Sequence, residues 1–126
     1  IYEELLGHVR YICRHRFGSR VAERLIEQSN ERVGGPFFDR IIEFAPELAI
    51  HRFGNYVVQS FLELSPEPFQ RRCAMGLLLH ADKLLARNRG FFVLRAAKEY
   101  CCDARLRAAF EIILEEYDSP YRRNKW

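Results

Sequence analysis

The apolar residues of this chain recur at intervals of three and four, which is the spacing of one buried face of an α-helix. The same apolar series occurs three times, each copy 36 residues after the previous one. The series are Tyr2, Leu5, Leu6, Val9 and Ile12; Phe38, Ile41, Ile42, Ala45 and Leu48; and Ala74, Leu77, Leu78, Ala81 and Leu84. This pattern predicts the first helix of each of three repeated units.

A second apolar series follows each of these helices and begins after a glycine. Gly18, Gly54 and Gly90 occupy the same place in the three units. The residues expected to be buried after them are Val21, Ala22, Leu25 and Ile26; Val57, Val58, Phe61 and Leu62; and Val93, Leu94 and Ala97. The pattern predicts a second helix in each unit, with a weaker apolar face in the third, where Lys98 takes the fourth place.

Helix-breaking residues interrupt this regularity at several points, including Ser65 to Pro68 with its two prolines. Gly34-Gly35-Pro36 predicts a break between the first and second units. Pro46 lies inside the first helix of the second unit, where proline removes a backbone hydrogen bond, and it predicts a kink or a split there.

A fourth copy of the first-helix series has no second helix after it. It comprises Phe110, Ile113, Leu114 and Tyr117, and Ser119-Pro120 then ends the pattern, so we expect this helix to cap the third unit. A fixed period of this length predicts an all-α solenoid of stacked two-helix units. The expected boundaries are about 1–36, 37–72 and 73–108 for the units, about 104–117 for the capping helix and 118–126 for a basic tail.

Composition narrows the classes of function. The net charge is +3, and 17 of the 20 basic residues are Arg, which suits phosphates and base edges better than Lys does. A bias of codon usage explains the excess equally well, so it supports a nucleic-acid partner only weakly. No apolar run reaches the ~18–20 residues of a membrane span, and we expect no membrane partner.

The chain shows no enzyme signature and no metal-binding spacing. Cys13, Cys73, Cys101 and Cys102 form no CxxC pair. His15 and His51 occupy one repeat position, which favours a structural role between units over metal binding. No phosphate-binding loop or nucleophile arrangement is present. We therefore expect no catalytic residues, no metal and no cofactor.

The second helix of the second unit carries one candidate binding surface, the second-unit trio of Asn55, Tyr56 and Gln59. On a helical wheel Tyr56 lies about 100° and Gln59 about 40° from Asn55, opposite the apolar face. Two amides beside a ring can hold one unpaired base, because the amides pair with its edge and the ring stacks on its face.

The first unit has a matching first-unit trio of Ser19, Arg20 and Glu23. A carboxylate beside a hydroxyl suits guanine, whose Watson–Crick edge offers N1–H and N2–H donors, and the guanidinium can stack. The alternative is that both trios are ordinary solvent-facing residues. That alternative does not explain why a glycine, a stacking residue and polar residues recur in phase.

The stretches HRFGSRVAERLIE and HRFGNYVVQSFLE resemble the Pumilio (PUF) repeat, and the resemblance covers about residues 1–100. It implies a right-handed superhelical solenoid in which each second helix reads one base of single-stranded RNA. It also implies that Asn55 and Gln59 contact the edge of a uracil and that Tyr56 stacks on it.

By the same resemblance, Ser19 and Glu23 contact a guanine and Arg20 stacks on it. PUF arrays run antiparallel to their RNA, so the implied element is 5′-UG-3′. The order of the units is similar to the C-terminal end of a PUF domain.

The third unit departs from the repeat. Phe91, Phe92 and Arg95 replace the polar readers, so no base is assigned, and all three are candidate RNA contacts. Phe92 either stacks on the base held by the second unit or helps Phe91 to close the end of the solenoid.

The resemblance implies sequence-selective RNA binding in post-transcriptional regulation of mRNA, such as translation repression, in the cytoplasm. Two alternatives stay open: a nucleolar or organellar ribosome-assembly component that holds structured RNA by its backbone, and a protein-interaction solenoid. Two base readers bind weakly, so we expect further PUF repeats or protein partners in a ribonucleoprotein to supply more contacts.

Overall fold

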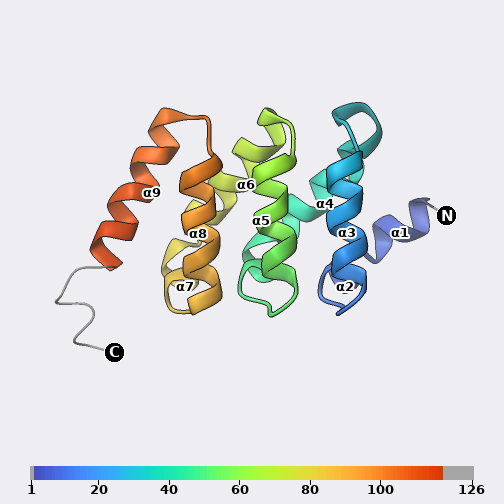
Figure 1. The fold of residues 1–126 in the computed structure, drawn as a ribbon, viewed down its shortest axis with the longest axis horizontal. Helices are drawn as coiled ribbons and strands as arrows, with labels where there is room; N and C mark the ends of the chain where they lie inside the picture. Colours follow the sequence, from blue (N-terminus) through green and yellow to red (C-terminus); the bar gives the residue numbers. More distant parts are fainter. Residues whose placement is uncertain (1, 118–126) are drawn as a thin grey trace.

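The computed structural model describes the backbone of residues 2–117 and the side chains of residues 4–30 and 32–117, so the expected basic tail lies outside the described residues. The regular secondary structure in this part of the chain is entirely α-helical (Figure 1). The helices are α1 (Tyr2–Gly7), α2 (Val9–Cys13), α3 (Gly18–Gln28), α4 (Glu31–Ala49), α5 (Gly54–Leu64), α6 (Glu67–Leu79), α7 (Ala81–Leu85), α8 (Asn88–Tyr100) and α9 (Ala104–Tyr117).

The helices form two rows. In Figure 1 the second helices α3, α5 and α8 stand side by side, α9 follows α8, and α2, α4, α6 and α7 lie behind them. The contacts agree, since α3 packs on α5, α5 on α8, α8 on α9, and α4 on both α2 and α6. Each unit touches mainly its neighbours, which confirms the predicted all-helical solenoid.

The repeated glycine allows the two helices of a unit to meet closely. A Cβ at Gly18 would lie 2.5 Å from the carbonyl oxygen of Ile12, and one at Gly54 would lie 2.9 Å from that of Leu48. At Gly90 an added Cβ would collide in the same way with the Leu84 carbonyl. Only a residue without a side chain fits where the second helix starts against the end of the first.

The repeated histidine stabilises the same turn through hydrogen bonds. The Nδ1 atom of His51 accepts the backbone N–H groups of Phe53 at 3.0 Å and Gly54 at 3.2 Å. His15 Nδ1 accepts the corresponding N–H groups at 3.1 and 3.2 Å. These bonds satisfy amides at the start of a helix, which have no partner within it. Both histidines thus have a structural role, but these bonds lie within one unit rather than between units as predicted.

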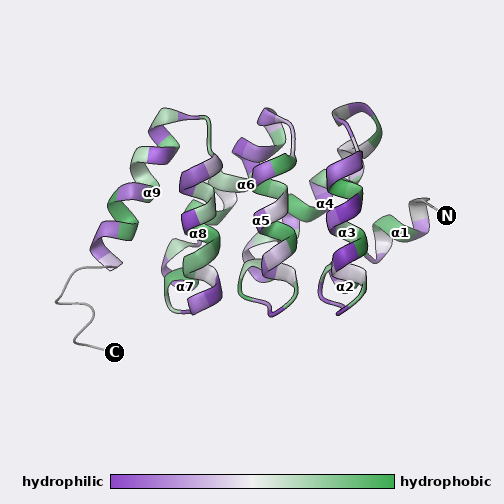
Figure 2. Ribbon diagram, in the orientation of Figure 1, coloured by the Kyte–Doolittle hydropathy of each residue, from purple (hydrophilic) through white to green (hydrophobic). Residues whose placement is uncertain are grey.

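The core lies between the two rows and is continuous along the solenoid. Phe38 of α4 is fully buried, and its ring meets Phe61 edge-on at 5.5 Å and Phe69 at 5.2 Å between centroids. Figure 2 shows hydrophobic and hydrophilic residues alternating along α3, α5, α8 and α9, as expected for amphipathic helices. No helix among the described residues combines the length and the apolarity that a membrane crossing needs.

The prediction that Val21 is buried is wrong. Its side chain is 53% exposed, whereas Val57 and Val93 at the same repeat position are fully buried. Those two valines lie on helices that pack against the second helix of the preceding unit, α3 for Val57 and α5 for Val93. Within the described residues α3 has no second helix before it, so the same side chain stays in solvent.

The predicted breaks also differ from the structure. The loop expected at Gly34-Gly35-Pro36 is helical, because Asn30 caps α4 at its N-terminus by accepting the N–H of Val33 at 2.9 Å. Nor does Pro46 split α4, which continues to Ala49. Proline in a helix costs about 3 kcal/mol, and the burial of residues on both sides of Pro46 offsets that cost.

The first helices break instead at His8 and His80, which share one repeat position. At His80 the backbone N–H bonds to Leu77 rather than to Gly76, whose carbonyl oxygen lies 3.0 Å from the imidazole Nδ1 of His80. The side chain therefore occupies the acceptor that a continuous α-helix would use.

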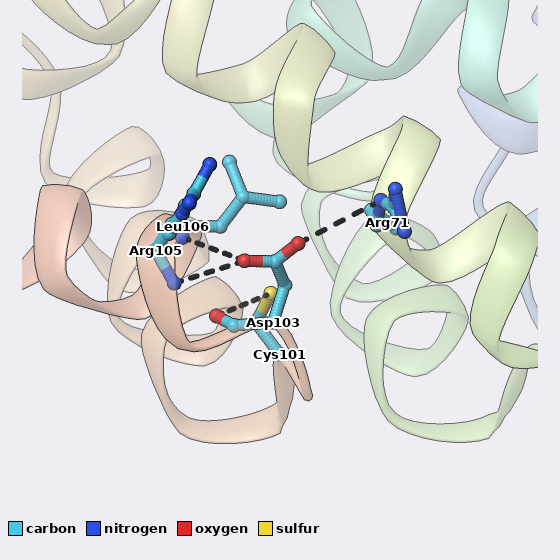
Figure 3. Close-up of polar contacts among 5 residues, drawn as sticks. All are labelled: Arg71, Cys101, Asp103, Arg105 and Leu106. Carbon is cyan, nitrogen blue, oxygen red and sulfur yellow. Dashed lines mark hydrogen bonds and ion pairs between the residues drawn. The ribbon is translucent and has the colours of Figure 1, made fainter.

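The expected capping helix is present as α9. Asp103 caps its N-terminus, since its Oδ1 atom accepts the N–H groups of Arg105 at 2.9 Å and Leu106 at 3.2 Å (Figure 3). Its other oxygen pairs with Arg71 of α6 at 3.7 Å. These interactions lower the pKa of the Asp103 carboxyl from its ordinary value, and the hydrogen bond from Leu106 has the largest effect.

Candidate nucleic-acid interface

Asn55 lies near the start of α5, and its amide is bonded to the preceding turn. Its Nδ2 atom donates to the carbonyl oxygens of His51 at 2.8 Å and Arg52 at 3.1 Å. The side chain is only 5% exposed, so the prediction that it faces away from the buried side is wrong. The reason is that the turn before α5 folds back over it. Both Asn55 N–H donors are therefore used within the protein.

Gln59 is oriented by Asn55. Its Nε2 atom donates to Asn55 Oδ1 at 3.1 Å, one helical turn away. Because the Asn55 amide is held by two carbonyls, its oxygen must point toward Gln59. The chain of bonds leaves the oxygen of the half-buried Gln59 and one of its N–H groups for a ligand.

A groove of about 490 Å³ runs beside these amides between α5 and α8. Tyr56 from α5 and Phe92 from α8 line it, and these residues are 59% and 52% exposed. The full lining is Asn55, Tyr56, Gln59, Arg89, Phe92, Arg95, Ala96, Glu99 and Tyr100. The structure thus brings the second-unit trio together with two of the three third-unit candidates, Phe92 and Arg95.

Phe91 points elsewhere. Its ring stacks on Tyr117 of α9, with the centroids 4.4 Å apart and the planes inclined by 29°. It is half-buried, and the Arg95 guanidinium lies 5.9 Å from its centroid. The structure therefore does not place Phe91 in the groove. This packing follows one of the two readings that the sequence left open, closure of the end of the solenoid.

Arg89, Glu99 and Tyr100 line the groove but were not identified from the sequence. The sequence could have identified Glu99 and Tyr100, because positions 92, 95, 96, 99 and 100 are spaced three and four residues apart and therefore share one face of a helix. Tyr100 also faces Glu63, whose negative charge is the main cause of a raised pKa of the phenol.

The first-unit trio is arranged differently. Ser19 is 5% exposed, and its hydroxyl donates to the Arg16 carbonyl oxygen at 3.3 Å. Glu23 is half-buried, and its Oε1 atom accepts the hydroxyl of Ser60, on α5, at 3.0 Å. Arg20 is exposed. The carboxylate is thus bonded to the next unit rather than to its own helix.

Positive charge gathers at the turns before α3 and α5 and in the first turn of α8. The pKa of His51 is lowered, mainly by burial and then by the positive charges of Arg14, Arg89 and Arg52. The negative charge of Glu47 acts in the opposite direction and raises it. The three arginines come from three successive units and are exposed.

Within the described part of the chain, no group of three or more His, Cys, Asp and Glu residues could hold a metal ion.

A second hollow of about 500 Å³ lies among the first helices, away from both trios. Phe44, Pro46, Ile50 and Leu84 supply its apolar wall, and Arg10 pairs with Glu47 at 2.5 Å beside it. It contains none of the residues selected from the sequence as candidate RNA contacts.

Comparison with known proteins places this arrangement in a family. A family model described as a NOP9-like PUF repeat domain matches residues 7–89. Pumilio homolog 9 of Arabidopsis thaliana is 30% identical over 84 residues, which are 67% of this chain and 15% of that protein. Pumilio homolog 1 of Xenopus laevis is 27% identical over 97 residues, 77% of this chain and 8% of that protein. The chain thus spans a small part of these relatives.

Solved structures share the fold. The Puf3 RNA binding domain bound to Cox17 RNA 3′ UTR recognition sequence site A has a TM-score of 0.78 and 27% identity, covering 93% of this chain and 33% of that one. PUF-8 in complex with PBE-RNA has a TM-score of 0.79 and 23% identity, and the match covers 92% of this chain and 33% of that one. At this identity the match shows only that the two chains share a fold. From the matched helical repeats and this shared architecture we conclude that the chain belongs to the PUF repeat family.

Proposed function

We propose that the row of second helices binds single-stranded RNA and that the second-unit trio reads a uracil. The observation that carries this proposal is the hydrogen-bond chain from the turn through Asn55 to Gln59, at the edge of a groove with two exposed rings. The RNA-bound Puf3 domain, which shares the fold, supports the class of ligand.

The groups that remain free match uracil. Its Watson–Crick edge has one N–H donor between two carbonyl acceptors, and Gln59 offers an oxygen to the donor and an N–H to a carbonyl. In this proposal Tyr56 of α5 and Phe92 of α8, which both line the groove, stack on the base from its two sides. Stacking contributes about 1–3 kcal/mol per base and does not select among bases, so selectivity depends on the amide.

For the first unit, we propose that Glu23 accepts the N–H donors of a guanine. Its Oε2 atom remains available, because the bond from Ser60 uses Oε1. Arg20 is exposed and can stack beside it. With the antiparallel order of PUF arrays, the two units read 5′-UG-3′.

Two bases provide little specific affinity after the cost of association. The proposal therefore includes further contacts from more PUF repeats or from partner proteins, with a role in regulating mRNA in the cytoplasm. The 3′ UTR origin of the RNA bound by Puf3 supports an mRNA target.

The test is fluorescence anisotropy of this chain with labelled single-stranded RNAs that differ only at a UG step. We expect UG to bind more tightly than CG or UA. The double variant Asn55→Ser and Gln59→Glu, which copies the first unit, should change the preference at that base from U to G. Gln28→Glu is a matched control, because it makes the same chemical change at an exposed position outside the groove. Unchanged selectivity in the double variant would contradict the base assignment.

The exposed arginines around His51 favour a second candidate function, in which the chain holds structured RNA by the RNA backbone. Binding would then depend steeply on salt, because each phosphate neutralised releases counterions. Titrating the same RNAs in salt separates the two functions. Equal affinity for all sequences with a steep salt slope would favour the second.

A further inference from the structure

The hydrogen bond between Ser60 and Glu23 joins two neighbouring units at the row of second helices. We propose that Ser60 is a positioning residue for Glu23, so that base selectivity of the first unit depends on a residue of the second unit. The proposal rests on the RNA-reading function proposed above. It adds a specificity-determining residue that lies outside both trios.

The direction of this bond is fixed by chemistry. A carboxylate has only acceptors, so the Ser60 hydroxyl must donate, and a hydrogen bond to a charged acceptor is about twice as strong as a neutral one. The bond is 3.0 Å long, both residues are half-buried, and α3 and α5 pack together along this line. Holding Oε1 restricts the rotation of the side chain and presents Oε2 to the ligand.

Ser19 cannot perform this role within the first unit. Ser19 is the residue of the first unit that matches Asn55, but its single hydroxyl proton goes to the Arg16 carbonyl. Asn55 has two N–H groups for its turn and an oxygen left for Gln59. A serine at that place cannot donate to both the turn and the carboxylate, so the donor comes from the next unit.

The second unit supplies the contrast. Ala96 of α8 stands 36 residues after Ser60 and lines the groove with Gln59, but its methyl group makes no hydrogen bond. Gln59 does not need one, because Asn55 orients it from its own helix. The two readers are therefore oriented by different means, the amide within its unit and the carboxylate across the boundary between units.

The first experiment compares Ser60→Ala with Ser60→Thr in binding to RNAs that carry UG, UA or CG. We expect Ser60→Ala to reduce the preference for G over A by roughly three- to tenfold, while the preference for U over C at the neighbouring base stays unchanged. Ser60→Thr keeps the hydroxyl and should keep the ratio. A loss of protein stability alone would weaken the binding of all three RNAs by the same factor and leave the ratios of their affinities unchanged.

The second experiment builds the bond where it does not exist. In the variant Asn55→Ser with Gln59→Glu, the new carboxylate shares the groove with Ala96, and adding Ala96→Ser supplies the missing donor. We expect the triple variant to prefer G over A at that base roughly three- to tenfold more strongly than the double variant. Ala96 is 7% exposed, and serine adds one oxygen there. This comparison decides the question even if Ser60→Ala does not fold.

The outcomes separate this proposal from the function on which it rests. If the unmodified chain binds RNA with a preference for UG, and neither Ser60→Ala nor Ala96→Ser changes the G to A ratio, the positioning role is overturned and RNA reading stands. If the unmodified chain binds no RNA sequence, the proposed function is overturned together with this proposal.

Discussion

The imidazole of His51 holds the start of α5 through its unprotonated nitrogen, because Nδ1 accepts the backbone N–H of Gly54 at 3.2 Å. Protonation of Nδ1 would remove that acceptor. Burial and three neighbouring arginines lower the pKa of His51 from its ordinary value of 6.5. The neutral imidazole is thus the form that the folded protein favours.

The first prediction concerns pH. A group whose pKa is lowered by folding contributes stability that is complete above its unfolded-state pKa and is lost as the pH falls toward its folded-state pKa. We expect the midpoint of thermal unfolding to fall as the pH decreases below about 6.5. His51→Asn keeps a side-chain acceptor that does not titrate and should flatten this dependence. An equal slope in both proteins would show that His51 is not its source.

The second prediction concerns the repeated glycine. Gly54→Ala places a Cβ 2.9 Å from the Leu48 carbonyl, and we expect it to reduce the free energy of unfolding by about 1–3 kcal/mol. Gly76→Ala is the matched control, because an added Cβ there meets nothing within 4 Å. In the helix interior that change should stabilise by about 0.5–1 kcal/mol. Chemical denaturation of the two variants measures both effects, and equal shifts would refute the packing argument.

A third prediction separates two adjacent rings. Phe92→Ala removes an exposed ring from the groove, so RNA affinity should fall by about fivefold to a hundredfold with little change in stability. Phe91→Ala removes the stack on Tyr117 and should instead lower the free energy of unfolding by about 1–3 kcal/mol. Anisotropy and denaturation of both variants test the pair. Equal effects of the two changes on affinity would contradict the assigned roles.

The fourth prediction concerns the cap of α9. Asp103→Ala removes the acceptor of the Arg105 and Leu106 N–H groups and should lower the midpoint of thermal unfolding. Asp103→Asn keeps an acceptor and loses only the charge opposite Arg71. A single ion pair with an exposed Arg71 and a separation of 3.7 Å contributes little, so this variant should stay close to the unmodified chain. A loss in Asp103→Asn as large as in Asp103→Ala would assign the effect to the charge.

The sequence predicted the helices and their repetition because the underlying interactions are local. Apolar intervals of three and four determine which face of a helix is buried, and the glycine recurs because each unit makes the same close approach at Ile12, Leu48 and Leu84. The capping helix was predicted for the same reason. Burial was less predictable where it depends on a neighbouring helix, as the exposure of Val21 shows.

For the candidate site, the sequence alone determined which residues could read a base, since repeat position and side-chain chemistry are both visible in it. Only the tertiary structure decided how they are held. It buried Asn55 under its own turn, placed Phe92 rather than Phe91 in the groove, and set Ser60 against Glu23. These relationships depend on hydrogen bonds and contacts between segments that pack together only in the folded chain, and a linear pattern contains no record of those distances.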